Sequence, residues 1–282
     1  MSRLHSAAFI CALARQSAAA LSGSLARIQE LRECFDRSGV LLITNDSTDA
    51  TPDMLRRWKA SSQGVDVLCL DGLAASVKAR TDRLAAARNL GLHHLRQAME
   101  TGRRFDIMVV IDTDGINSRL VTGDAFVNAI ASAPQDWVAV FGNQRQAYYD
   151  IWALRHPKWC PGDCWQDVQR ATQCYPPPFR GRAAAKAAKR FVGERQVRIP
   201  PENDPISVDS AFGGIGIYRS DALSGVWYSG RDEAGREVCE HVGLNLRLRA
   251  AGGRLYILPA LLNDAPSEHL VEGWGAAASP WL

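Results

Sequence analysis

The sequence predicts an α/β protein whose central sheet is mostly parallel and is covered by helices on both faces. In the first 143 residues, short and nearly continuous apolar segments alternate with longer segments of helical spacing. Continuous apolar strands of this kind are typical of parallel sheets that are buried on both faces. The composition, 46% hydrophobic and 22% charged over 282 residues, is ordinary for a globular chain. A chain of this length buries a large core without disulfides or structural metal.

Five strands are predicted in the first half. They are Ala7–Ala14, Val40–Thr44, Val65–Leu70, Asp106–Ile111 and Trp137–Gly142. The helices expected between them are Ala18–Arg37, a helix with Pro52 in its first turn, Thr81–Thr101 and a helix around Ala125–Ala131. The first helix is expected to run to Arg37 because Leu21, Leu25, Ile28, Leu31 and Phe35 recur at helical spacing.

The second half is less regular. Ala147–Pro205 is rich in aromatic residues and proline, and we expect a loop with one short helix near Arg182–Phe191. The stretch Arg180–Arg198 has seven Lys or Arg residues against one Glu. A solvated basic face is its default interpretation, while a mobile lid over a diphosphate and a site for an acidic glycan are the alternatives.

Regular structure is predicted to resume after this region. We expect a glycine-rich strand or hairpin at Ala211–Arg219, a helix at Glu240–Ala250 and a last strand at Leu255–Leu258, with an irregular tail from Leu262 to Leu282. One domain over residues 1–282 is expected, with a nucleotide-binding half up to about residue 145 and an acceptor-binding half from about residue 146.

Composition excludes several classes of protein. Seven cysteines without a regular framework indicate free thiols in a reducing compartment. The apolar stretch Ser6–Ala14 is too short for a signal peptide, and no segment approaches the ~18 apolar residues of a membrane span. A net charge of +3 does not indicate nucleic-acid binding. We therefore expect a cytoplasmic protein, and peripheral association with a membrane stays open as an alternative.

The strongest chemical signal is Asp112-Thr113-Asp114-Gly115, which follows an apolar strand. Two carboxylates one residue apart at a strand end converge on a hard divalent cation, Mg²⁺ or Mn²⁺, which also takes phosphate oxygens as ligands. Such a metal would neutralise charge on a leaving nucleoside diphosphate. The competing interpretation is a simple turn, since Asp and Gly both favour turns.

Other strand ends and one helix start are candidate binding segments. Ala14 and Arg15 lie at the end of the first strand, and Asn45–Thr51 follows the second. In the second segment, Asp46 could accept hydrogen bonds from a base or ribose. The alternative is that Ser47, Thr48 or Asp49 caps the next helix. Arg80 and Arg83 open the next long helix, where guanidinium groups suit nucleotide oxygens, although surface ion pairing is the commoner fate of an arginine.

In order along the chain, N-D-S-T-D-A-T at residues 45–51, R-T-D-R-L-A-A-A-R-N at 80–89 and V-V-I-D-T-D at 109–114 resemble the nucleotide-binding half of GT-A glycosyltransferases. Three later segments, 149–155, 209–214 and 239–242, resemble the fungal capsule α-1,3-mannosyltransferase family more closely. Those relatives are usually membrane-anchored, whereas we expect no anchor in this chain. The resemblance implies a GT-A fold, with a Rossmann-like and mostly parallel sheet.

The resemblance also implies roles for individual residues. Asp46 would contact the base, and Arg80 and Arg83 would line the nucleotide pocket. Asp112 and Asp114 would hold the metal, with Asp114 as the firmer ligand. Gly213 and Gly214 would let the backbone approach the donor sugar or acceptor. Glu240 would face the acceptor, as a base in an inverting reaction or as a hydroxyl clamp in a retaining one.

A late histidine often completes the metal shell in this fold. His269 is the first candidate and His241 the second, against a packed or surface histidine as the alternative. Four aromatic residues are candidates to stack on a sugar face, or else to be local core: Trp152, Trp159, Trp165 and Tyr149.

The predicted function is transfer of a hexose, such as mannose, from a GDP- or UDP-sugar to a glycan or other hydroxyl acceptor. Two alternatives remain. A nucleotidyltransferase is disfavoured because Ala12–Arg15 is not a glycine-rich phosphate loop, and a non-catalytic sugar- or polyanion-binding protein would use the basic segment without turnover.

Overall fold

A single eight-stranded sheet organises the protein. The computed structural model describes residues 3–264. The strand order is β3-β2-β1-β4-β7-β5-β8-β6. The strands are β1 Leu4–Leu13, β2 Phe35–Thr44, β3 Val65–Cys69, β4 Ile107–Asp112, β5 Trp137–Gln144, β6 Ile206–Val208, β7 Ile215–Arg219 and β8 Arg254–Asn263. β6 and β7 pair antiparallel with their neighbours and the other pairings are parallel, so the predicted α/β class with a mostly parallel sheet is confirmed.

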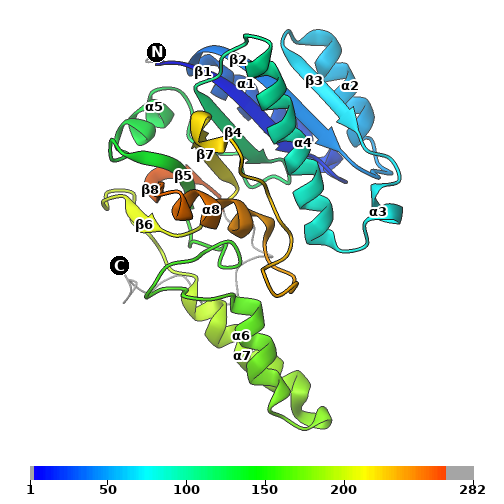
Figure 1. Ribbon diagram of the computed structural model, residues 1–282, viewed down its shortest axis with the longest axis vertical. Helices are drawn as coiled ribbons and strands as arrows, with labels where there is room; N and C mark the ends of the chain where they lie inside the picture. The colour runs from blue at the N-terminus through cyan, green and yellow to red at the C-terminus, as the bar shows by residue number, and fades with distance from the viewer. Residues whose placement is uncertain (1–2, 265–282) are drawn as a thin grey trace.

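Helices cover both faces of this sheet (Figure 1). They are α1 Ala18–Glu33, α2 Thr51–Ser61, α3 Leu73–Ser76, α4 Arg80–Glu100, α5 Gly123–Ala131, α6 Cys164–Gln173, α7 Arg180–Phe191 and α8 Glu240–Ala250. Short 3-10 helices lie at Pro177–Phe179, Gly193–Arg195 and Asp221–Leu223. Among the described residues, no helix is both long enough and apolar enough to cross a membrane.

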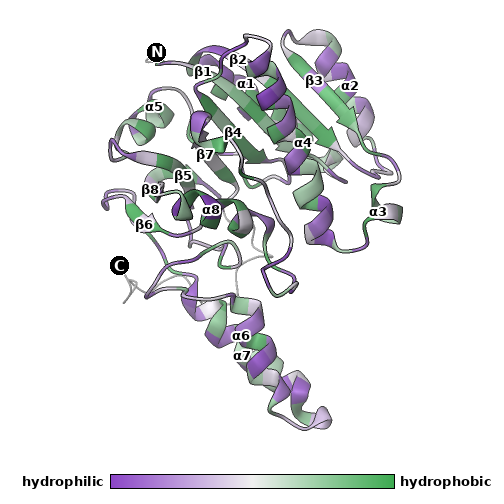
Figure 2. Ribbon diagram, viewed as in Figure 1, coloured by the Kyte–Doolittle hydropathy of each residue, from purple (hydrophilic) through white to green (hydrophobic). Residues whose placement is uncertain are grey.

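Successive side chains along each strand point to opposite faces of the sheet, and they form two separate cores. In β1, Phe9 and Cys11 belong to the cluster that α4 and α8 cover, whereas Ala8 and Ile10 belong to the cluster under α1, α2 and α5. The strands are accordingly the most hydrophobic ribbons of the molecule, and the helices carry their hydrophilic residues outward (Figure 2). Burial on both faces explains why these strands are continuously apolar in sequence.

The strand ends that the sequence identifies as candidate binding segments lie together in the structure. β1 pairs in parallel with both β2 and β4, and Leu13 lies opposite Ile43 and Asp112. The carboxyl ends of these three strands therefore lie side by side, with Arg15, Asn45 and Asp114 just beyond them.

Several element boundaries differ from the prediction. The first helix ends at Glu33 rather than Arg37, because Phe35 opens β2 opposite Leu4 and packs edge-on against Phe126 with the ring centres 6.0 Å apart. β8 extends to Asn263, beyond the predicted Leu258, because Leu262 pairs with Asn143 after a register shift. β7 begins at Ile215, since Gly213 and Gly214 form a turn just before it.

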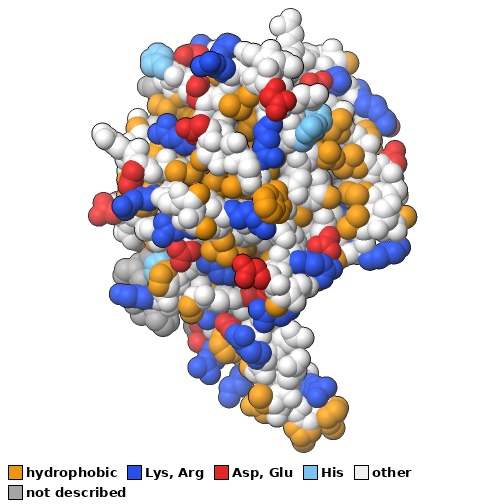
Figure 3. Space-filling model, in the orientation of Figure 1, with side chains coloured by type: hydrophobic (Ala, Val, Ile, Leu, Met, Phe, Trp, Pro, Cys, Tyr) orange, Lys and Arg blue, Asp and Glu red, His pale blue; other side chains and the backbone are white. Residues whose placement is uncertain are grey.

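The region expected to be mostly loop holds a helical hairpin. α7 lies close to the predicted short helix, but α6 was missed. Asp163 caps α6 by accepting hydrogen bonds from the backbone N–H groups of Trp165 and Gln166, both at 3.0 Å. α6 and α7 pack against each other and project from the body of the protein (Figures 1 and 3).

Close packing of α4 on β1 depends on Gly91. A Cβ added at Gly91 would lie 2.6 Å from the Cys11 sulfur, which is too close for an unshifted contact. We expect G91A to destabilise the protein by about 1–3 kcal/mol through overpacking. In a C11A background the same change should stabilise it, because alanine favours a helix over glycine by about 1 kcal/mol.

Urea unfolding of G91A, C11A and the double variant measures this reversal of sign. The matched control is G181A in α7, where an added Cβ meets nothing within 4 Å, and which should stabilise in either background. Destabilisation by G91A of equal size with and without Cys11 would contradict the packing argument.

Candidate active site

A cavity of about 580 Å³ opens at the carboxyl ends of β1 and β4. Both halves of the chain contribute to its wall. The charged and aromatic wall residues include Arg15, Arg80, Arg83, Arg88, Asp112, Asp114, Trp152, Trp165, Glu240 and His241. Cationic and anionic side chains therefore face one space, as a ligand with both phosphates and a metal requires.

Arg88 joins the two acidic positions of the cavity. Its Nη2 donates to Oδ1 of Asp112 at 3.0 Å, and its Nε donates to Oε1 of Glu240 at 2.9 Å. The Arg88 residue is only 4% exposed. Burial lowers the pKa of this guanidinium, but the Glu240 and Asp112 carboxylates outweigh burial and raise it above its ordinary value. Arg88 is thus a fixed cation between β4 and α8.

The electrostatics of Asp112 favour a cation in the cavity. Burial raises the pKa of this carboxyl from 3.8 to about 7; Arg88 opposes the shift, while the nearby Asp114 and Glu240 add to it. Its side chain keeps 26% of its exposure, toward the cavity. Asp112 and Glu240 contact Arg88, and Asp114 adds negative charge near Asp112. A divalent cation would favour the ionised form of Asp112.

The two aspartates predicted to bind a metal both line the cavity. Asp112 and Asp114 lie at the end of β4, and Asp114 is exposed. No group of three His, Cys, Asp or Glu residues able to hold a metal ion occurs within residues 3–264. His269 lies outside the described residues. If the two aspartates bind a metal, phosphate oxygens, water or a further residue would have to complete its shell.

His241 occupies the cavity wall as a neutral imidazole. Burial, and then the positive charge of Arg88, lower its pKa well below 6.5. Its ring stacks on Phe212 with the ring centres 3.6 Å apart, and neither ring nitrogen has a hydrogen-bond partner among the described residues. Nε2 lies 3.5 Å from Oε1 of Glu240. Both nitrogens are buried polar atoms left without a partner, beside the carboxylate of Glu240.

The predicted arginines lie at the rim of the cavity. Arg15 and Arg80 are exposed and line it. Arg83 lines it as well, but its Nη1 donates to the carbonyl oxygens of Val77 and Lys78 at 2.9 and 2.6 Å. Arg83 therefore also orders the segment that precedes α4.

Asp46 has a structural function. Its carboxylate accepts hydrogen bonds from the backbone N–H groups of Gly72 and Ala74 at 2.7 and 2.8 Å, and from the Asn45 side chain at 3.0 Å. These bonds, with that from Asn45 foremost, lower the pKa of Asp46. In this structure Asn45, rather than Asp46, lines the cavity.

Three other predicted binding residues do not line the cavity. Ala14 is 1% exposed and belongs to the core under α1, while its neighbours Leu13 and Arg15 face the cavity. Gly213 and Gly214 have φ angles of 63° and 83°. An added Cβ would lie 2.6 Å from the Gly142 carbonyl oxygen or 2.9 Å from Ile116 Cδ1, respectively. Internal packing is thus sufficient to require glycine at both positions.

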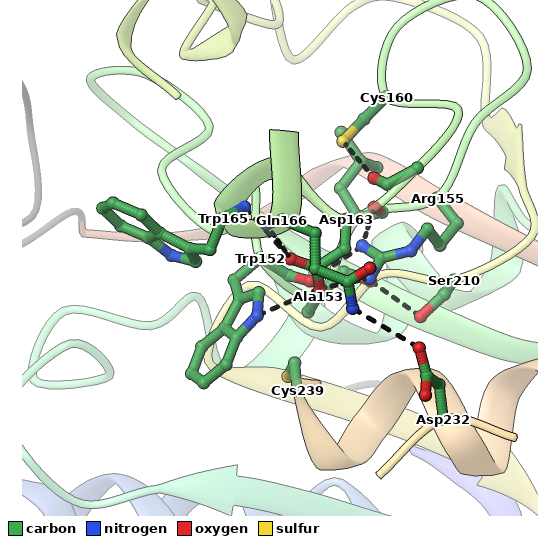
Figure 4. A network of polar contacts seen from close by, with 12 residues as sticks. Trp152, Ala153, Arg155, Cys160, Asp163, Trp165, Gln166, Ser210, Asp232 and Cys239 are labelled. Atoms are coloured by element: carbon green, nitrogen blue, oxygen red, sulfur yellow. Dashed lines mark hydrogen bonds and ion pairs between the residues drawn. The ribbon is translucent and has the colours of Figure 1, made fainter. Parts of the chain in front are cut away.

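Trp152 is held in the wall by a buried polar network (Figure 4). Its Nε1 donates to Oδ2 of Asp163 at 3.1 Å, and Arg155 Nη2 donates to the same oxygen at 2.7 Å. The second wall tryptophan, Trp165, is 47% exposed at the start of α6. The two indoles are the surfaces on which a sugar ring could stack.

Sequence reasoning missed the roles of Arg88 and Phe212. Arg88 lies within the segment 80–89 that carried the resemblance, but its role depends on α8, 152 residues later in the chain. Arg88 also lies over the Phe212 ring, 5.1 Å from its centre, and no local pattern predicts that contact.

Comparison with known proteins supports the fold. No protein-family model matches the chain, and no curated protein matches it. Among solved structures, the mannosyltransferase PcManGT from Pyrobaculum calidifontis, in complex with GDP-Man and Mn²⁺, is similar with a TM-score of 0.51 and 16% identity, over 96% of this chain and 59% of that one. The chain therefore has the GT-A glycosyltransferase fold, as predicted.

Two further structures show weaker similarity. S. aureus TarS 1–349 in complex with UDP has a TM-score of 0.49 and 11% identity over 93% of this chain and 61% of that one. Glucosyl-3-phosphoglycerate synthase from Mycobacterium tuberculosis, in complex with UDP, has a TM-score of 0.39 and 14% identity over 87% and 65%. The chain spans less than two thirds of the length of each of these three chains.

Removal of Arg88 should expose its importance to the site. We expect R88M to lose about 3–5 kcal/mol of unfolding free energy, because two carboxylates would lose their buried partner. Adding E240Q to R88M should recover part of this loss. Urea unfolding at pH 7 measures both changes.

The matched control is R231M. Arg231 pairs with Asp82 at 2.8 Å, but its side chain is 48% exposed. Exposed pairs contribute about 1 kcal/mol or less, so R231M should have a small effect. Equal losses in R88M and R231M would contradict the role of the buried cation.

Proposed function

We propose that this chain is a metal-dependent glycosyltransferase that moves a hexose from a nucleoside-diphosphate sugar to a glycan or other hydroxyl acceptor. One observation carries the proposal: Asp112 at the end of a central strand and Asp114 just beyond it line a cavity whose wall also holds exposed arginines and a buried glutamate. This combination offers oxygen ligands for a cation, cationic contacts for a diphosphate and a carboxylate for an acceptor hydroxyl in one space.

The donor is proposed to lie across the strand ends. Arg15 and Arg80 at the cavity rim suit its nucleotide oxygens, and Asn45 at the end of β2 offers an amide to the base or ribose. The first 145 residues thus form the proposed nucleotide-binding half and the later residues the acceptor-binding half. GDP-mannose and UDP-hexoses are the donors to test, given the resemblance to capsule mannosyltransferases and the GDP-Man bound in PcManGT.

Asp112 and Asp114 are proposed to hold Mn²⁺ or Mg²⁺ together with donor phosphate oxygens, and His269 stays a proposed third ligand. When bound, the metal would stabilise charge on the leaving nucleoside diphosphate. Arg88 limits how far Asp112 can move, since it bonds Oδ1 of that carboxylate. This bond supports the assignment of the exposed Asp114 as the firmer ligand.

Glu240 is proposed to receive the acceptor hydroxyl. Its carboxylate is 3% exposed, lies in the cavity wall and is oriented by Arg88 Nε. A carboxylate in that position accepts the hydroxyl proton in an inverting reaction or orients the hydroxyl in a retaining one. Trp152 and Trp165 are proposed to stack on sugar faces.

Nucleotide binding should depend on both the metal and Asp114. With GDP or UDP at about 100 times its dissociation constant, Mn²⁺ should raise the melting temperature by on the order of 5 °C, because the ligand binds only the folded state. D114N should abolish the manganese-dependent part of this shift. Thermal unfolding with GDP, UDP and CDP, each with and without Mn²⁺, measures it.

D53N is the matched control, because Asp53 is an exposed carboxylate at the start of α2. It should keep the full shift. If no nucleotide shifts the folded wild-type protein, or if D114N retains the shift, the proposed donor site is wrong. A polyanion-binding protein would instead bind heparin equally well in wild type and D114N.

Substitution of Glu240 should lower turnover without weakening donor binding. We expect E240Q to lower release of GDP or UDP from the sugar donor by about 100-fold or more, with methyl mannoside as acceptor. The glutamine can neither accept the hydroxyl proton nor bind the hydroxyl through a charged acceptor. Its nucleotide-dependent thermal shift should stay close to that of wild type, since glutamine can still accept the Arg88 hydrogen bond.

E100Q, at the exposed end of α4, is the control and should leave turnover unchanged. Undiminished release of nucleotide by E240Q would remove Glu240 from the proposed chemistry while leaving the donor site intact.

A further inference from the structure

The hairpin of α6 and α7 is held together by small apolar residues. Val168 and Ala187 are buried between the two helices, and Ala171 and Ala188 pack beside them. Among residues 3–264, the outer sides of the hairpin and its tip have no neighbours in the body of the protein (Figure 1). Within the described part of the chain, the hairpin is therefore a projection that exposes its outer sides.

Its tip is apolar and exposed. All residues from Gln173 to Arg182 are exposed, a run of ten. Tyr175 is 47% exposed and Phe179 58%, and three prolines lie between them. Figure 3 shows the hydrophobic side chains gathered at this far end of the molecule. Aromatic side chains concentrated on a projecting tip mark a contact surface.

The side chains behind the tip are basic. Within residues 164–192 there are six Lys or Arg residues and one acidic residue, Asp167. Asp167 is already paired with Arg170 and with Arg195 near the hairpin base. On α7 the exposed cations are Arg180, Arg182, Lys186, Lys189 and Arg190. The hairpin thus presents positive charge just behind an apolar end.

We propose that this hairpin docks on the surface of an anionic lipid bilayer. Tyr175 and Phe179 enter the boundary between headgroups and acyl chains, and the α7 cations contact the anionic headgroups. Lys186 lies seven residues from Phe179, about 10 Å along the helix at ~1.5 Å per residue. An apolar end buried to about 5–10 Å would place these cations at headgroup level.

The apolar tip favours a bilayer over a nucleic acid or an acidic protein. Three consecutive prolines offer apolar area but no N–H donors, so they suit a hydrocarbon boundary better than phosphates or carboxylates. The base of the hairpin meets the cavity at Trp165. Since α6 is ten residues long, docking would hold the cavity about 15 Å or more from the bilayer. The inference stands whether or not the proposed transfer reaction is correct.

Vesicle flotation tests the docking surface. We expect the protein to float with phosphatidylcholine vesicles that contain about 30% phosphatidylglycerol, and not with pure phosphatidylcholine vesicles. Y175S/F179S and R182E/K186E should each lower the partition coefficient about tenfold or more. Salt at about 0.5 M should weaken the binding, because it screens surface charge.

Two control variants match these changes at other exposed positions. W227S/L246S removes two exposed apolar side chains, of 51% and 44% exposure, from outside the hairpin. R56E/R57E reverses two exposed charges on α2, at the opposite end of the molecule (Figure 1). Both should partition like wild type. Circular dichroism and nucleotide-independent melting temperatures identify any variant that fails to fold.

A probe at the tip tests insertion directly. Cys174 and Cys69 are exposed, whereas the other five cysteines are buried. A polarity-sensitive fluorophore on Cys174 of C69S should shift to the blue on anionic vesicles and be quenched by spin-labelled acyl chains. The same fluorophore on Cys69 of C174S should do neither.

Three results would overturn the proposal. They are failure to float with anionic vesicles, equal loss of binding in R56E/R57E and R182E/K186E, and flotation without a change at the Cys174 probe. Binding to heparin or duplex DNA without binding to vesicles would assign the basic hairpin to a different polyanion instead.

Discussion

The buried Arg88 is the interaction on which the candidate site depends. It bonds Asp112 at the end of β4 and Glu240 at the start of α8, two residues 128 positions apart in the chain. A buried guanidinium requires carboxylate partners, and the buried carboxylates require it in turn, so the three side chains fix one another. The proposed metal-binding strand end and the proposed acceptor residue are therefore held at a set spacing by charge rather than by backbone connection.

Arg88 can join these residues because the sheet brings distant segments of the chain together at the carboxyl ends of its central strands. β1, β2 and β4 run in parallel and end together. The antiparallel β7 then joins β4 to β5, which carries the second half of the chain against the first. Gly213 and Gly214, just before β7, adopt left-handed backbone at this junction and allow Gly142 and Ile116 to approach closely. Their role is to close the sheet beside the cavity.

The sequence predicted the parts of the fold that local pattern determines. The apolar strands, the Glu240–Ala250 helix and the aspartates at the end of β4 follow from periodicity and from turn chemistry. The first helix was extended too far because Phe35 continues its apolar spacing, whereas the structure uses Phe35 in β2 against Phe126. α6 was missed because its capping by Asp163 depends on a buried pair with Arg155, which is a tertiary contact. The structural role of Asp46 could not be predicted for the same reason, because its backbone partners Gly72 and Ala74 lie 26 and 28 residues later in the chain.

Asp163 couples the hairpin to the cavity. One carboxylate oxygen accepts the two backbone N–H groups that begin α6, and the other accepts Arg155 and the Trp152 indole. Arg155 in turn donates to the carbonyl oxygens of Trp152 and Leu154. A tilt of α6 would move the Asp163 carboxylate. That movement would either break the buried hydrogen bond from Arg155 or shift Trp152 together with the carboxylate. Because buried charged bonds are costly to break, movement of Trp152 is the less costly response. A surface that restrains the hairpin tip would thus restrain the orientation of an aromatic side chain in the cavity wall.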